Sequence, residues 1–249
     1  MKKITSLALV LVLIISVFGF TSCAGAVEVD TIDGSTPEEA YTRAIQRLDE
    51  IDKYYVNLDM KASMKLAIVE IPIMNIEGFY FYSYEGDNVH CGITDSAMEQ
   101  MENADVADAV SGYEKEMWYV DGVCYVDTGS SLYKFESSYC PIENSQYERA
   151  VKELIDEGEG EFHCYKKGDL YYFTITNTDN SNMKFEVGAD KETFTVYFDE
   201  KGFIQEINVR IELGGISILT LASRYFYGDD AEHVTAPANK EEFLNRSYW

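Results

Sequence analysis

The sequence predicts a mainly antiparallel β protein of the α+β class, with about nine or ten strands and three amphipathic helices. Residues 56–68 alternate apolar and polar side chains, as in a strand with one buried face. Asp121-Gly122 separates two short apolar runs, which is a strong hairpin signal. The helical segments do not alternate with strands in a βαβ rhythm, which disfavours a parallel doubly wound sheet.

The chain begins with the pattern of a secretion signal. A short basic start precedes an apolar run from Ile4 to Phe20, and small residues then lead to Cys23. The segment Phe20-Thr21-Ser22-Cys23 resembles the lipobox of bacterial lipoproteins, in which the peptide is cut before the Cys and its thiol receives a diacylglycerol. We therefore expect residues 1–22 to be a signal peptide and lipidated Cys23 to hold the protein on the outer, extracytoplasmic face of the cell membrane.

Two other interpretations of this start remain open. The apolar run, about 17 residues long, is near the lower limit for crossing a bilayer as an uncleaved anchor. An ordinary signal peptide followed by a coincidental Cys would have the same appearance. All three interpretations place the rest of the chain outside the cytoplasm, and no later stretch is long and apolar enough to span a membrane.

Composition narrows the classes of molecule that the protein is expected to bind. The formal net charge of -24 repels phosphate backbones, so nucleic-acid binding is disfavoured. It also repels anionic lipid head groups, so we expect the lipid rather than a basic patch to hold the protein at the membrane. Because 46% of the residues are hydrophobic, the chain should nevertheless fold. We expect a tether over residues 23–35 and one domain over 36–249, although the Pro141–Gly160 insert is also consistent with a seam between two similar β halves.

Three segments have helical character. Thr36, Pro37 and Glu39 form an N-terminal capping box with proline at the first helical position. Apolar residues follow at helical spacing as far as Tyr55. Residues 95–110 and 144–157 are the other two helical segments, and the second has the clearer apolar stripe.

The remaining regular segments have strand character. They begin with the long alternating run over residues 56–68 and continue along the chain. The predicted strands after this run are Phe79–Tyr84, Met117–Val120, Val123–Asp127, Leu132–Phe135, Leu170–Thr176, Met183–Val187, Thr193–Phe198, Phe203–Leu213 and Ile216–Tyr227.

This order of elements resembles the lipoprotein-carrier-like superfamily, which includes the LolA/LolB and LppX/LprG types. The resemblance lies in the lipobox, a short tether, the helix Ala40–Lys53, a long Met- and Lys-containing strand, and hairpins such as those in residues 118–125 and 196–203. It implies an open, strongly curved β half-barrel whose helices cover the concave face and enclose a cavity that holds acyl chains in characterised members. It implies no catalytic residues, and the gating Arg of some carriers has no recognisable counterpart here.

A hydrophobic or lipid ligand is therefore the first functional hypothesis. The second is a non-catalytic cell-envelope lipoprotein with a packed core that binds an envelope protein, because protein interiors normally fill to high density. The candidate cavity-lining residues are Val56, Leu58, Met60, Met64, Leu66, Met183 and Phe185.

The four cysteines after Cys23 allow two disulfides or four free thiols, and the sequence favours neither. They are Cys91, Cys124, Cys140 and Cys164. The dipeptides His90-Cys91 and His163-Cys164 suggest a zinc site or a Cys91–Cys164 disulfide. Because adjacent strand residues face opposite ways, a pair would rarely meet one metal, and we predict no metal site.

Enzymatic chemistry has little support, and we expect neither catalysis nor a cofactor. The acidic runs near residues 156–161 and 229–230 lack calcium-loop spacing, and no serine lies in a nucleophile-elbow motif. The tyrosines of the predicted strands allow a second interpretation, in which exposed rows bind a sugar or a partner protein. The alternative is that tyrosine simply suits half-buried strand positions. These residues are Tyr80, Tyr82, Tyr84, Tyr171, Tyr172, Tyr225 and Tyr227.

Overall fold

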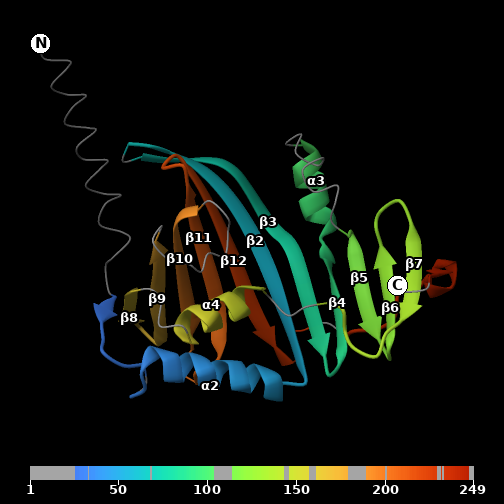
Figure 1. Cartoon of the computed structure of the whole chain (residues 1–249), viewed down its shortest axis with the longest axis horizontal. Helices are drawn as coiled ribbons and strands as arrows, with labels where there is room; N and C mark the ends of the chain where they lie inside the picture. Colours follow the sequence, from blue (N-terminus) through green and yellow to red (C-terminus); the bar gives the residue numbers. More distant parts are fainter. Residues whose placement is uncertain are drawn as a thin grey trace, which may run out of the picture.

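One large curved β-sheet dominates the fold, and three α-helices lie beside it (Figure 1). The structure is a computed structural model, and it describes residues 26–32, 34–67, 69–103, 114–142, 146–156, 161–178, 189–199, 201–228, 231 and 233–246. The apolar N-terminal run, Cys23, the predicted strand Met183–Val187 and the end of the predicted helix 95–110 therefore lie outside the described residues.

The helices form where the sequence predicts them. The helix α2 (Pro37–Glu50) begins with the expected capping box, in which Thr36 and Glu39 each bond the other's backbone N–H. The helix α3 (Asp95–Asn103) and the helix α4 (Gln146–Asp156) correspond to the other two helical segments. A short 3₁₀ helix, η3 (Lys240–Glu242), follows near the C-terminus.

The sheet contains thirteen described strands in the order β1-β8-β9-β10-β11-β12-β2-β3-β4-β5-β6-β7-β13. All neighbours are antiparallel except β13 and β7. The strands are β1 (Val27–Glu28), β2 (Lys53–Leu66), β3 (Val69–Glu85), β4 (Asn88–Ile93), β5 (Glu116–Val120), β6 (Val123–Asp127), β7 (Leu132–Glu136), β8 (Glu161–Lys167), β9 (Leu170–Thr178), β10 (Ala189–Phe198), β11 (Ile204–Leu213), β12 (Ser217–Tyr227) and β13 (Leu244–Asn245).

The sheet is open rather than a closed barrel, because β1 and β13 form two separate edges. Two antiparallel meanders, β2–β7 and β8–β12, meet where β12 pairs with β2. The Pro141–Gly160 connection does lie between these meanders, but both belong to one sheet. It leads from β7, near one edge, to β8, near the other.

The predicted Asp121-Gly122 hairpin is confirmed. It joins β5 to β6, and both turn residues have positive φ, at 52° and 81°. This is the geometry of a type I′ turn. The strands β4 and β8 were not predicted, and β3 extends well before Phe79. The strand β3 pairs with β4 only over Tyr80–Glu85, so the part of β3 before Tyr80 lacks a β4 neighbour. Pro72, which has no N–H to donate, is accommodated in that part because no β4 carbonyl needs a donor there.

A single hydrophobic cluster joins the two meanders to two of the helices. Tyr41 and Leu48 of α2 and Val151 of α4 are buried in it. They share the cluster with fully buried strand residues such as Phe173 and Phe194. Glu148 links the helices to the sheet, because its backbone oxygen accepts from the Tyr41 hydroxyl at 2.8 Å and its carboxylate from Tyr225 at 2.6 Å. The third helix packs separately, through Ala97 and Met101, against Ile76 and Ile93.

Replacing Phe194 with Ala should lower the free energy of unfolding by about 3–5 kcal/mol, because it leaves a cavity in this cluster. Phe226 is 40% exposed, so Phe226→Ala should cost about 1 kcal/mol or less. Urea unfolding of both variants measures the difference. Equal costs would contradict the placement of the core beneath α2 and α4.

Candidate functional site

A row of tyrosines on β3 faces the hydrophobic interior. Tyr80, Tyr82 and Tyr84 alternate along the strand, and their register partners on β2 are Leu58, Val56 and Tyr54. The rings of Tyr54 and Tyr84 stack with centroids 4.5 Å apart. The row continues along β3, with Tyr82 and Tyr84 at 6.2 Å and Tyr80 and Tyr82 at 5.1 Å. The aromatic row therefore forms part of the interior wall and not an exposed binding surface.

A pocket lies at the Tyr84 end of this row, where the C-terminal end of α2 meets β2, β3 and β4. Its volume is about 270 Å³, just below the usual range for ligand pockets. Its lining residues are mainly apolar or aromatic, but polar atoms contribute most of the surface that they expose to it, which suits a ligand with a polar group beside its apolar part. The lining residues are Leu48, Ile51, Tyr54, Tyr84, Gly86, Asp87, Val89, Cys140 and Ile142.

The Tyr84 hydroxyl is the unusual feature of this pocket. The residue is only 6% exposed, and its buried hydroxyl has no hydrogen-bond partner among the described residues. Burial raises the pKa of Tyr84, so the phenol stays protonated and remains a donor. Leaving such a group unpaired costs about 1–3 kcal/mol.

Three other tyrosine hydroxyls of the interior have hydrogen-bond partners, in contrast to that of Tyr84. The Tyr80 hydroxyl donates to Cys91 Sγ at 3.3 Å, and the Tyr119 hydroxyl donates to the Ser137 carbonyl at 3.2 Å. The Tyr225 hydroxyl donates to the Glu148 carboxylate. A ligand that carries an acceptor atom would supply Tyr84 with the partner it lacks.

The interior cysteines are free thiols. Cys91 and Cys124 are fully buried, and burial raises the pKa of each to about 12. Burial also raises the pKa of Cys140, in the pocket wall, and that of Cys164 to about 11. Cys91 and Cys164 lie on β4 and β8, between which the sheet order places six strands, β9, β10, β11, β12, β2 and β3, and the two form no disulfide.

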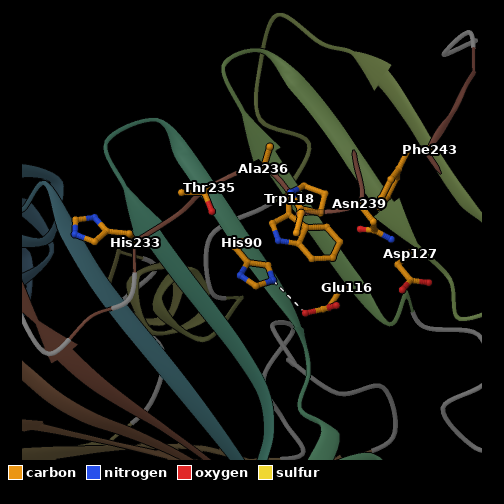
Figure 2. Close-up of a pocket in the computed structure, with 11 residues that line it drawn as sticks. His90, Glu116, Trp118, Asp127, His233, Thr235, Ala236, Asn239 and Phe243 are labelled. Atoms are coloured by element: carbon orange, nitrogen blue, oxygen red, sulfur yellow. Dashed lines mark hydrogen bonds and ion pairs between the residues drawn. The ribbon is translucent and has the colours of Figure 1, made fainter. Parts of the chain in front are cut away.

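A second hollow lies on the opposite face of β4–β6, under the C-terminal segment (Figure 2). Its volume is about 420 Å³, and His90, Glu116, Trp118 and Asp127 are among its lining residues. Figure 2 shows His90 bonded to Glu116, at 3.3 Å, beside the Trp118 ring with which it stacks. His90, Glu116 and Asp127 all lie on strands, so the strand register sets the positions of these polar side chains.

The His-Cys dipeptides do not build a metal site. Cys91 lies in the interior cluster, whereas the adjacent His90 faces the second hollow, as alternation along a strand requires. His163 pairs with Glu28 at 3.4 Å and His233 with Glu85 at 2.7 Å. Among the described residues, no group of three or more His, Cys, Asp or Glu side chains is arranged to hold a metal ion.

The predicted cavity residues fall in three places. Val56 and Leu58 are buried in the main cluster, and Met60 packs partly buried between that cluster and α3. Met64 and Leu66 are exposed at the far end of β2. Met183 and Phe185 lie outside the described residues.

Sequence reasoning missed the pocket residues around Tyr84. The sequence identifies Tyr80, Tyr82 and Tyr84 as a row, but one interpretation expects the row to be exposed and to bind a sugar or a partner protein. Tyr84 and Tyr225 are buried, so that interpretation is wrong for these two. The signal that would have placed the row inside is its pairing with Val56 and Leu58, which depends on the register of β2 against β3.

Comparisons with known proteins add no functional assignment. No family model matches the chain, and no curated protein matches it significantly. One similar solved structure is that of a DUF1329 family protein from Desulfovibrio piger, at 10% identity and a TM-score of 0.22, covering 78% of this chain and 93% of that chain. A TM-score this low does not establish a common fold. In the part of the chain that the structure describes, no helix combines the length and apolarity needed to cross a membrane.

Tyr84→Phe removes the unpaired hydroxyl and should raise the free energy of unfolding of the ligand-free protein by about 1 kcal/mol. Tyr119→Phe is the matched control, since it removes a satisfied buried hydroxyl from β5 of the same meander and should lower stability by about 1 kcal/mol. Chemical unfolding curves test both. A loss of stability in Tyr84→Phe equal to that in the control would mean that the hydroxyl is already bonded.

Alkylation with iodoacetamide at pH 8 should modify Cys140 first and leave Cys91 and Cys124 intact. Cys140 is the least buried of the three, and thiols with pKa values of about 12 hold almost no thiolate at that pH. Peptide mass spectrometry identifies the modified residue. Failure of all the thiols to react after denaturation without reductant would show that they are disulfide-bonded.

Proposed function

We propose that this protein is a lipid-anchored extracytoplasmic binding protein that takes the acyl part of a neutral lipid into the pocket beside Tyr84. The observation that supports this most directly is Tyr84, which lines the pocket and whose buried hydroxyl lacks a partner among the described residues. A stable protein rarely leaves such a group unpaired. A carbonyl oxygen of a bound lipid is a suitable acceptor for it.

The fold is consistent with the half-barrel that the family resemblance implies. In this proposal, the curved sheet is an open half-barrel with α2 and α4 on its concave face. The support is the shared cluster, in which Tyr41, Leu48 and Val151 of the helices pack with inward strand residues. The helix α2 then forms one wall of the pocket through Leu48 and Ile51.

Charge favours a neutral ligand. The chain has a formal net charge of -24, and exposed Asp87 borders the pocket. An anionic head group would approach against this potential, whereas an ester carbonyl carries no net charge. The protonated phenol of Tyr84 donates to such a carbonyl without burying a charge.

Location and anchorage are part of the same proposal and come from the sequence. The apolar run Ile4–Phe20 followed by Cys23 supports export and lipidation. A lipid on Cys23 would hold the protein at a membrane, which is a reservoir of acyl lipids. We propose a binding role rather than catalysis, because no serine lies in a nucleophile-elbow motif and burial raises the pKa of Cys140, the thiol in the pocket wall.

A second candidate function is an interaction lipoprotein with a filled core. Its support is the dense packing beneath α2 and α4, where Phe173, Phe194 and Phe198 are fully buried. In that case, the pocket beside Tyr84 is a packing defect, and a surface of the protein contacts an envelope partner.

Native mass spectrometry of residues 24–249, secreted and purified without detergent, separates these functions. We expect a lipid-sized adduct that dissociates on denaturation, is depleted in Tyr84→Phe and is retained in the control Tyr119→Phe. The carbonyl–phenol hydrogen bond should contribute about 1 kcal/mol, or about a fivefold change in affinity. A bare mass in the parent protein would reject the ligand-binding proposal in favour of the filled core.

A further inference from the structure

Six large aliphatic side chains are exposed together at one end of the sheet. They occupy the end of the β2–β3 hairpin and the adjoining β11–β12 turn, and their exposed fractions run from 39% for Met64 to 63% for Ile73. The backbone bond from Lys65 N–H to the Ile216 carbonyl joins the two turns. This group, here called the aliphatic tip, consists of Met64, Leu66, Val69, Ile71, Ile73 and Ile216.

The strand register places four of the six side chains of the tip on one face. Met64 lies opposite Ile71, and Leu66 lies opposite Val69, so the four side chains share one face of the hairpin. Along β2 this is also the face of buried Val56 and Leu58, because alternate residues point the same way. The tip is therefore an extension of the interior face beyond the packed core.

Two of the acidic side chains beside the tip pair with cations, and a third, that of Asp190, accepts from the Gly215 N–H in the β11–β12 turn. Arg210 binds the Glu70 carboxylate through two nitrogens, at 3.1 and 3.3 Å, and Lys65 binds Glu212 at 3.4 Å. The Arg210 guanidinium lowers the pKa of Glu70, so the pair stays ionised. Although the chain is strongly acidic, two cations offset two of the carboxylates at this end of the sheet, so a neutral lipid surface would not repel it.

The chemistry of the tip favours hydrocarbon over a protein partner. Binding hot spots of protein interfaces are rich in Trp, Tyr and Arg and poor in Leu and Val. The tip is wholly aliphatic, although the chain contains 19 Tyr, 13 Phe and 2 Trp. An exposed aliphatic patch on a monomeric surface needs an apolar environment. Lys65, whose side chain is 42% exposed, is placed to keep its ammonium in the head-group region while the tip is immersed.

We propose that the aliphatic tip inserts into the outer layer of a lipid bilayer as a second, non-covalent membrane contact. Insertion of about 5–10 Å, to the boundary between head groups and acyl chains, buries all six side chains. The inference needs the membrane location in the proposed function but does not need the ligand pocket.

Tryptophan quenching tests the proposal in the full-length chain reconstituted in phosphatidylcholine vesicles. Leu66→Trp places a reporter in the tip, and Leu244→Trp places one at an aliphatic position that is 72% exposed on β13. Buried Trp118 and the C-terminal Trp249 give the same background in both proteins. Lipids brominated near the head group should lower the added emission of Leu66→Trp about twofold and leave that of Leu244→Trp unchanged.

A further variant, made in the Leu66→Trp protein, tests whether the hairpin drives the insertion. Adding Val69→Ser and Ile71→Ser to Leu66→Trp should restore the emission, because the hairpin then loses its hydrophobic drive to insert. Equal quenching at positions 66 and 244, or none at 66, overturns the proposal. Protection of position 66 without bromine quenching, together with a cross-linked dimer, would instead assign the tip to a second copy of the chain. Failure here with a lipid adduct still present would leave the ligand-binding proposal standing.

Discussion

The pairing of β12 with β2 is the constraint on which the rest of the structure depends. It runs from Tyr227 opposite Tyr54 to Ser217 opposite Met64 and joins the two meanders through strands that are far apart in the chain. Closing so long a loop costs conformational entropy, which the continuous ladder and the shared hydrophobic cluster offset. Because β2 pairs on its other side with β3, the same strand also sets Tyr54 against Tyr84. The candidate pocket and the aliphatic tip are thus the two ends of one central strand pair.

The interior is filled at one place and hollow at another for a geometric reason. Beneath α2 and α4, bulky side chains such as Phe173 and Phe194 fill the space between helix and sheet. The helix α2 ends at Glu50, and the chain turns at once into β2, so the last turn carries Leu48 and Ile51 to the edge of the filled region. The pocket beside Tyr84 lies at that edge. An unpaired phenol at this position reduces stability, which is the expected signature of a group kept for binding and not for folding.

Local signals in the sequence predicted the local structure well. The capping box of Thr36 and Glu39, the alternation of β2 and the Asp121-Gly122 turn each act over a few residues, and each is present. The strand order was beyond reach, because it depends on which distant edges pair. The short strand β4, which contains Gly92, was missed for a related reason. A Cβ at position 92 would lie 2.7 Å from the Lys115 carbonyl, so the glycine reflects a close approach to the next strand rather than a turn. The same holds for the candidate sites. The sequence identified Met64 and the tyrosine row, but only the strand register shows that Met64 is exposed and that the row faces the interior.

The central claim is a hydrogen bond between Tyr84 and a carbonyl of a bound acyl lipid. Infrared spectroscopy of the complex with a carbonyl-¹³C-labelled monoacylglycerol observes that bond directly. A carbonyl band at lower wavenumber in the parent protein than in Tyr84→Phe, with Tyr119→Phe matching the parent, is the predicted result. Bound lipid whose carbonyl band is the same in the parent and in Tyr84→Phe would contradict the account.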